Sequence, residues 1–327
     1  MRHVLIGLGW IALCVGAFGV LIRSLELHNQ RLVMICSAAP YLMAAGLVAV
    51  VVLGVTRHWI GFAVSLVVAV AAVVGQAPLF VPDGAPAEGG TELTVMQANI
   101  WLGNADADAL VEQIVTEEVD VVTINELTPD AIVRLTTAGI ADELPYSFAR
   151  PFSGGAGTGI WSRYPLSEEV HYEEFLLSAL SARIALPDER SAEVYAFHPV
   201  PPWPTPVSVW AGEMDRISAI LNEIPADSGP VIVSGDFNAT RDHLKYRNLV
   251  SGRFRDAADQ AGSGVQNTYP ADQAPLPPMI AIDHIASSDA HARSVDAVTI
   301  EGSDHRGLIA RLVLDDVDGR TAAERCR

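Results

Sequence analysis

Charged residues are almost absent from the first 82 residues of the chain. This segment carries four basic side chains and one acidic side chain: Arg2, Arg23, Arg31, Arg57 and Glu26. The remaining 245 residues hold 17 basic and 38 acidic side chains, which gives the 327-residue chain a formal net charge of −18 at a positive mean hydropathy. Neither a single soluble domain nor a largely disordered chain combines these properties. The sequence therefore predicts two unlike parts.

Cysteine and lysine are also scarce. Cys14, Cys36 and Cys326 all lie outside residues 83–314, so the acidic part needs no disulfide framework and could fold in either redox compartment. Lys245 is the only lysine, and the basic stripe typical of nucleic-acid-binding proteins is missing. The sequence contains no Gly-x-Gly-x-x-Gly motif and no P-loop, which disfavours nucleotide cofactors held in those ways.

Three long runs without charge occupy the N-terminal part. They cover 19, 24 and 23 residues at Val4–Ile22, Leu32–Val55 and Trp59–Val81. About 20 apolar residues suffice to cross a hydrocarbon core of roughly 30 Å. A cleavable signal peptide is the alternative for the first run, but no convincing cleavage site precedes Arg23 and two further runs follow. We therefore expect residues 1–81 to form a three-span transmembrane anchor.

A segment rich in glycine, proline and alanine follows the third run. Residues 82–92 read PDGAPAEGGTE and predict a flexible linker. This flank has no lysine or arginine but contains Asp83, Glu88 and Glu92, whereas cytoplasmic flanks are usually enriched in basic residues. We expect a multi-pass protein of the plasma membrane whose acidic domain is extracytoplasmic.

Residues 93–314 are predicted to form this domain, with a polar tail at 315–327. Short apolar strand candidates recur. Helical patterns lie between some of them, notably Ala107–Glu118, Pro129–Thr137, Ala211–Ile224 and Arg241–Ser251. The nine candidates are Leu93–Ile100, Val119–Ile124, Thr158–Ser162, Ala182–Leu186, Glu193–His198, Pro230–Ser234, Ile280–Ser287, Ala292–Ile300 and Leu308–Leu314. This order predicts a layered α/β sandwich rather than an alternating βαβ fold.

Polar residues cluster at the ends of these predicted strands. Strand ends that face one way can bring side chains from distant segments together on a substrate. The residues concerned are Gln97, Asn99, Asn125, Glu126, His198, Asp236, Asn238, Asp283, Asp304 and His305.

These segments resemble the endonuclease/exonuclease/phosphatase superfamily, which includes DNase-type nucleases, sphingomyelinases and inositol-phosphate phosphatases. The matching pieces occur in the family's order and cover most of residues 93–314: Gln97–Asn99, Asn125-Glu126, Gly159–Pro165, His198, Gly235–Asn238, Ile282–Ile285 and Ser303–His305. The resemblance implies a four-layer α/β/β/α sandwich of the DNase I type. Three preceding spans resemble the membrane-anchored branch that includes the VanJ-type teicoplanin-resistance proteins.

The resemblance also implies roles for the polar residues. Glu126 would hold Mg²⁺ or Mn²⁺, since a carboxylate is the hard oxygen donor that Mg²⁺ prefers, and Asn99 and Asp304 are additional metal-site candidates. Asp236 would orient and deprotonate the attacking water, while Asn238 would contact the phosphoryl oxygens. Asp283 would orient His305, and His198 would protonate the leaving group.

A proline-rich run with tryptophan follows His198. Residues 199–206 read PVPPWPTP, and Trp210 comes shortly after. One interpretation is a stiff polyproline-like surface loop. The other is an apolar lip, formed by Trp203 and Trp210, that receives a lipid tail or touches the bilayer interface. The sequence leaves both open.

These features predict a membrane-tethered, metal-dependent hydrolase of phosphate esters. A short tether to the bilayer favours a lipid phosphate or a lipid-linked pyrophosphate as substrate. The alternatives are an extracytoplasmic nuclease, a phosphodiesterase of the sphingomyelinase kind and a non-catalytic membrane receptor. The excess of acidic residues argues against nucleic acid as a partner.

Overall fold

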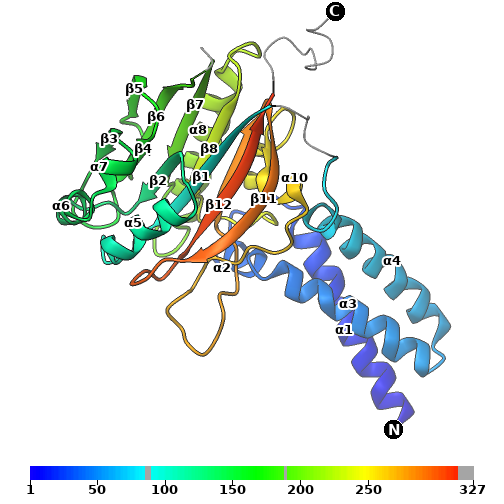
Figure 1. Ribbon diagram of the computed structural model, residues 1–327. Coiled ribbons are helices and arrows are strands. Elements are labelled where there is room, and N and C mark those ends of the chain that lie inside the picture. Colours follow the sequence, from blue (N-terminus) through cyan, green and yellow to red (C-terminus); the bar gives the residue numbers. More distant parts are fainter. Residues whose placement is uncertain (85–89, 188–189, 316–327) are drawn as a thin grey trace, which may run out of the picture.

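The computed structural model describes residues 1–84, 90–187 and 190–315 (Figure 1). Residues 85–89 of the predicted linker and 316–327 of the predicted tail lie outside the described residues. Over the described residues the strands form two six-stranded mixed sheets, preceded by a group of apolar helices.

The first sheet has the strand order β11-β12-β1-β2-β4-β3. Its strands are β1 (Thr91–Asn99), β2 (Val121–Asn125), β3 (Tyr146–Arg150), β4 (Thr158–Ser162), β11 (Ala290–Thr299) and β12 (Arg306–Leu314). One face is covered by α5 (Ala107–Thr116), α6 (Pro129–Thr137) and α7 (Ile140–Glu143). Asp106 begins α5 by accepting hydrogen bonds from two backbone N–H groups, as a good N-cap does.

The second sheet has the order β5-β6-β7-β8-β10-β9. Its strands are β5 (Leu166–Tyr172), β6 (Ala179–Ala185), β7 (Ser191–Phe197), β8 (Val231–Asp236), β9 (Arg255–Asp256) and β10 (Asp283–Ser288). The helices α8 (Val207–Glu223) and α9 (Leu244–Leu249) pack on its outer face, and α10 (Ala257–Ala261) lies beside β9 and β11.

The core between the sheets is built from the alternating inward residues of both. Val95 and Leu312 of the first sheet and Val194 and Ile232 of the second are fully buried in one cluster. The structure thus confirms an α/β sandwich with helices outside both sheets, and each predicted strand overlaps an observed one. The strands that the sequence did not indicate are β3, β5 and β9.

The N-terminal helices agree only in part with the predicted three-span anchor. They are α1 (Arg2–Ile22), α2 (Gln30–Cys36), α3 (Ala39–Val55) and α4 (Trp59–Gln76), followed by the 3₁₀ turn η1 (Ala77–Leu79). Two helices of the described residues, Arg2–Ile22 and Trp59–Leu79, are long and apolar enough to cross a membrane. The second predicted span is instead broken into α2 and α3, which meet at 63°.

The break has a local cause. Pro40 lies in the first turn of α3, where a missing N–H is tolerated, but inside a continuous helix its ring would clash with the carbonyl of Cys36. The α2 helix accordingly ends at Cys36. Close packing of α1 on α3 fixes the helices further: a side chain on Gly16 would collide with the backbone of Gly46.

The helices are docked onto the domain. Arg23, at the end of α1, forms an ion pair with the buried Asp242, which also accepts hydrogen bonds from Gln76 of α4. The His243 ring donates from Nε2 to the carbonyl of Val33 in α2 (3.0 Å), and its Nδ1 accepts from the backbone N–H of Thr240. The loop that follows β8 therefore holds α1, α2 and α4 against the sandwich.

Candidate active site

The functional candidates converge where the strand ends of the two sheets meet. β1 runs parallel to β2, and β7 runs parallel to β8, so their carboxyl ends share one edge of the sandwich. β10 is antiparallel to β8, which pairs Asp283 with Asp236 in register. His305 directly precedes β12, which is antiparallel to β1. The topology thus brings together residues that lie far apart in the sequence.

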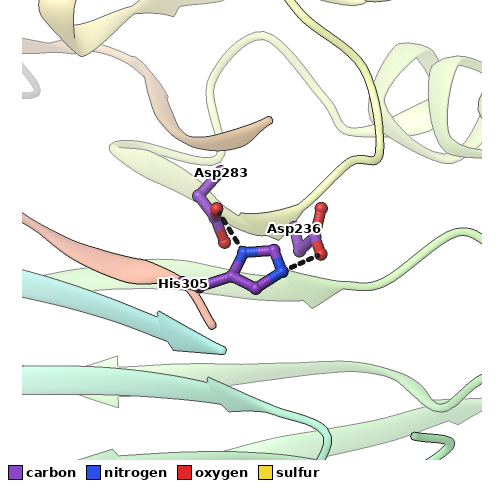
Figure 2. Close-up of side chains that lie close together, drawn as sticks. All are labelled: Asp236, Asp283 and His305. Atoms are coloured by element: carbon purple, nitrogen blue, oxygen red, sulfur yellow. Dashed lines mark hydrogen bonds and ion pairs between the residues drawn. The ribbon is translucent and has the colours of Figure 1, made fainter. Parts of the chain in front are cut away.

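The ring of His305 lies between two carboxylates (Figure 2). Its Nδ1 is 2.8 Å from Asp283 Oδ2, and its Nε2 is 3.8 Å from Asp236 Oδ2. The other oxygen of Asp283 accepts a hydrogen bond from Gln97 Nε2 at 2.9 Å. All four side chains are buried, so the hydrogen bonds fix the ring with Nε2 directed toward Asp236.

This environment raises the pKa values of both His305 and Asp236. Burial opposes a charge on His305, but Asp283, Asp236 and Asp304 outweigh it and raise the pKa of His305 to about 10. Burial and the charge of Asp283 raise the pKa of Asp236 to about 7, against the effect of His305. His305 is therefore an imidazolium at neutral pH, and Asp236 can exchange a proton there.

His198 lies on another side of Asp236. It follows β7, and its Nε2 is 3.7 Å from Asp236 Oδ2. Burial lowers the pKa of His198 to about 4, although the charge of Glu126 opposes this shift. The site thus holds one charged and one neutral imidazole around the same carboxylate, the separation of protonation states that acid and base roles require.

Asn99 joins two acidic groups. Its amide Nδ2 lies 3.1 Å from both Glu126 Oε1 and Asp236 Oδ2. The backbone N–H of Leu102 donates to Glu126 Oε2 at 2.6 Å. Because Asn99 directs a donor at both carboxylates, in this structure it orients the acidic groups.

The backbone is left-handed at two of the candidate residues. Glu126 has φ 61° and Asn238 has φ 50°; asparagine adopts this region readily, whereas glutamate rarely does, so the strain lies at Glu126. The N–H of Asn238 donates to Asp236 Oδ1 at 2.8 Å, and its Nδ2 donates to the carbonyl of Pro199. Unusual backbone at such positions is typical of sites that must aim a side chain.

Glu126 and Asp304 fit a divalent cation. Both line one cavity, and burial, helped by the charge of Glu126, raises the pKa of Asp304 to about 6 despite the opposing effect of His305. Asp304 Oδ1 is buried without a hydrogen-bond partner among the described residues. A hard cation such as Mg²⁺ would satisfy this oxygen and offset the repulsion between the carboxylates.

A second group could hold a metal by distance alone. Asp236, Asp283 and His305 each offer a ligand atom, and these atoms lie within 4.8 Å of one another. The nitrogens of His305, however, both face carboxylates, and an imidazolium is not a metal ligand. The geometry of this trio instead suits proton transfer and charge stabilisation.

The cavity that these residues border has a volume of about 400 Å³. Its lining includes the apolar residues Leu177, Pro201, Pro202, Trp203, Ile280 and Ile282, of which Trp203 is 64% exposed at the rim. Trp210 is 2% exposed inside the core under α8, where its Nε1 donates to the carbonyl of Phe237. The prediction that Trp210 forms part of an apolar lip is therefore wrong.

The structure adds residues that the sequence did not assign. Tyr269 places its ring 4.8 Å from that of His305, and Asn125 Oδ1 accepts from the N–H of Asp236 at 3.0 Å. Met34 and Ser37, at the bend between α2 and α3, line the same cavity. The sequence places Asn125 at its strand end without a role of its own. Tyr269 lies in a loop without a motif, and Met34 and Ser37 lie in a run that predicts a membrane helix.

Comparisons with known proteins agree with this architecture. The Endonuclease/Exonuclease/phosphatase family matches residues 96–305 of the sequence. Among curated proteins, none matches the chain.

Solved structures of similar fold share little sequence. Danio rerio (D. rerio) TDP2 complexed with a single strand DNA product is 17% identical at a TM-score of 0.57, covering 68% of this chain and 99% of that one. The mannosyl-6-phosphatase of Bacteroides thetaiotaomicron is 15% identical (TM-score 0.54, 68% and 100% covered). A Staphylococcus aureus beta toxin mutant with bound magnesium ions is 16% identical (TM-score 0.52, 69% and 100% covered). At these identities the likeness concerns the fold alone.

Proposed function

Because the chain belongs to the endonuclease/exonuclease/phosphatase family, whose members are metal-dependent hydrolases of phosphate esters, we propose that it hydrolyses a lipid phosphate or lipid-linked pyrophosphate at the membrane surface. One observation carries the lipid part of this proposal. Met34 and Ser37, which lie between two helices apolar enough to cross a membrane, form part of the wall of the catalytic cavity. A substrate that reaches Asp236 therefore passes beside the anchor.

The residues around the cavity divide the reaction between them. A water oxygen attacks phosphorus while the bond to the ester oxygen breaks, and the proton of the water passes to the carboxylate of Asp236. The imidazolium of His305 stabilises the negative charge on the phosphoryl oxygens. His198 protonates the departing oxygen, because an arriving phosphate anion raises the pKa of His198 from its low resting value.

Three further residues position these groups. Asp283 holds His305 in its charged form, and Asn99 orients Asp236 and Glu126 through one amide. Asn238 would contact the phosphoryl oxygens from the turn after β8.

Glu126 and Asp304 would hold Mg²⁺ or Mn²⁺. When bound, the cation neutralises phosphoryl charge and polarises the phosphorus–oxygen bond. The amide of Asn99 would keep the carboxylate of Glu126 in place for this purpose.

The apolar helices support a multi-pass membrane anchor, in which α3 runs antiparallel to α1 while the short α2 packs against the domain. We propose an extracytoplasmic domain, since the segment after α4 has no lysine or arginine before Thr91. The architecture also fits the VanJ-type branch of the family.

A nuclease is the second candidate, favoured by the similarity in fold to the TDP2 complex with a single strand DNA product. The acidic balance of the domain disfavours a polyanion, because phosphate-backbone binding depends on basic side chains. A phosphodiesterase that acts on a lipid is consistent with the same cavity.

The test is a substrate panel for the full chain in lipid nanodiscs with Mg²⁺ or Mn²⁺. Lipid phosphates, polyprenyl pyrophosphate, sphingomyelin and plasmid DNA are assayed in parallel, each with a chelator control. We expect metal-dependent release of phosphate or phosphorylated head group from a lipid. Cleavage of DNA alone would favour the nuclease, and no turnover by folded protein would reject the enzyme.

A further inference from the structure

A second cavity adjoins the catalytic one at the junction of the helices and the domain. Its volume is about 280 Å³, and its wall includes Tyr41 of α3, Leu79 of η1, Val265 and Met279 of the loop after α10, and Ile285 of β10. Ser37 and Ile280 line both cavities. Two side chains thus border the apolar cavity on one side and the catalytic cavity on the other.

The charged side chains in its wall are paired within the protein, and Arg241 Nε is the one buried polar side-chain atom of this wall that lacks a hydrogen-bond partner among the described residues. Asp242 pairs with Arg23, and Asn267 Nδ2 donates to the carbonyl of Pro278. His284 Nδ1 lies 2.9 Å from the carboxylate of Asp256, and its Nε2 donates to the carbonyl of Ala239. Little hydrogen-bonding capacity remains for water, and apolar cavities of even about 150 Å³ stay dry and take up hydrocarbon molecules.

The cavity lies where a lipid chain would arrive from a bilayer. Figure 1 shows α3 and α4 projecting from the body of the protein, with their near ends at α2 and α10. One hydrogen bond, 2.6 Å from Tyr41 Oη to the carbonyl of Met279, joins the start of α3 to the loop. Both residues are about half exposed, so they mark the outer side of the cavity.

We propose that this cavity holds the hydrocarbon chain of the substrate while the phosphate head group lies against Asp236 and Asp304. The inference rests on the proposed function and extends it, because it assigns the hydrocarbon chain of the substrate a site separate from the rim at Trp203. Ser37 and Ile280 would border the point where the chain leaves the head group.

Photolabelling tests the site without turnover. The full chain in nanodiscs is incubated with hexadecyl phosphate that carries a diazirine on its terminal carbon, irradiated and digested for mass spectrometry. We expect labels on residues that line the cavity, such as Leu79 and Val265, and competition by unlabelled hexadecyl phosphate. Labels confined to the outward faces of α1, α3 and α4, or to Trp203, would overturn the proposal.

Filling the cavity gives a second readout. Val265→Trp enlarges a half-exposed side chain of the cavity wall, so that its ring can occupy the cavity, and Val133→Trp is the matched control, because Val133 is a similarly exposed valine of α6 outside the cavity. Each methylene excluded from an apolar site weakens binding roughly fourfold. We expect the ratio of kcat/KM for hexadecyl phosphate to that for ethyl phosphate to fall at least tenfold in Val265→Trp and to stay constant in the control.

Photolabelling and the kcat/KM ratio together distinguish failure of the proposed enzyme activity from failure of the proposed site for the hydrocarbon chain. Labelling in the cavity without hydrolysis of either ester would reject the phosphoesterase proposal and retain the chain site. Hydrolysis of both esters with labelling elsewhere would reject the cavity as the site of the hydrocarbon chain but retain the phosphoesterase proposal. An unchanged kcat/KM ratio in a folded Val265→Trp protein would do the same.

Discussion

Arg23 Nε lies 2.9 Å from Asp242 Oδ1, and this ion pair joins the end of the first apolar helix to the loop that follows strand β8. Asp242 is buried, and Arg23 is 11% exposed. Asp236 ends β8, and Asn238 lies at the start of the same loop. The position of the helices and the geometry of the site are therefore physically linked.

Removing the arginine should destabilise this junction. Arg23→Ala leaves the buried Asp242 without its ion-pair partner, which typically costs about 3–5 kcal/mol. We expect a clear fall in Tm for the protein in nanodiscs, followed by circular dichroism. Arg293→Ala is the control, because its ion pair with Glu92 is exposed and such pairs contribute about 1 kcal/mol or less. Equal Tm changes in the two variants would contradict the role of the junction.

Asp236 is the residue on which turnover should depend most. Asp236→Asn keeps the size of the side chain but removes the proton acceptor, so we expect kcat to fall by about 10² to 10⁴. The measurement is phosphate release from a substrate identified in the panel, with folding checked by circular dichroism. Asp215→Asn changes an exposed aspartate on α8 and should leave kcat unchanged. A folded Asp236→Asn protein with near-normal kcat would remove Asp236 from the mechanism.

The metal requirement should depend on Glu126. A chelator is expected to abolish activity, and Mg²⁺ to restore it. Glu126→Gln removes a charge from the ligand set, so the Mg²⁺ concentration for half-maximal activity should rise by about tenfold or more, by analogy with losses at metal-supporting residues. Glu112→Gln, on the exposed face of α5, is the matched control. An unchanged Mg²⁺ titration would place the metal elsewhere.

Much of the fold could be predicted because buried strands leave a strong sequence signal. β2 and β8 are buried along their whole length, and each begins with an apolar run, Val121-Val122 and Val231–Val233. β5 was missed because it pairs only with β6 at the sheet edge and exposes Glu168 and Glu169. Short β9 offers two residues, too few for any pattern.

The site residues that the sequence analysis misassigned or missed also have specific physical causes. Trp210 begins a stripe with Met214 and Ile217 at helical spacing, so it belongs to the core, but the predicted helix started one residue too late to include it. Met34 lies in an uncharged run long enough for a span. Contacts with the domain distinguish this segment from a membrane helix: Val33 packs in the domain core, and His243 donates to its carbonyl. Hydropathy carries no information on such contacts.

The buried pair of His284 and Asp256 should make stability depend on pH. Both ring nitrogens of His284 face acceptors, so the ring is charged, and Asp256 together with the Ala239 carbonyl raises its pKa despite burial. The folded pKa lies above the unfolded value of about 6.5, so this contribution is complete below about pH 6.5 and is lost as pH rises through the folded pKa.

Asp256→Asn tests this dependence. Burial disfavours the charge of Asp256, but His284 outweighs it and lowers the pKa of Asp256, so the pair contributes fully only above about pH 4. We expect the difference in Tm between wild type and variant to be largest at pH 5–6 and to shrink toward alkaline pH. Asp227→Asn, an exposed change, should give a small difference at every pH. A Tm difference between wild type and Asp256→Asn that stays constant from pH 5 to pH 9 would mean that His284 is not charged.

Trp203 at the rim of the catalytic cavity provides the last test of how a lipid reaches the site. Its ring is 64% exposed, although it lines the cavity with Pro202, and an apolar ring at this place suits an interface between water and lipid. If Trp203 contacts the bilayer or the incoming lipid, Trp203→Ala should lower kcat/KM for a lipid phosphate in vesicles severalfold while sparing a water-soluble phosphate ester. Tyr146→Ala, an exposed aromatic change on the edge strand β3, controls for loss of surface apolar area. Equal activity of Trp203→Ala on both substrates would leave the rim as a stiff surface loop.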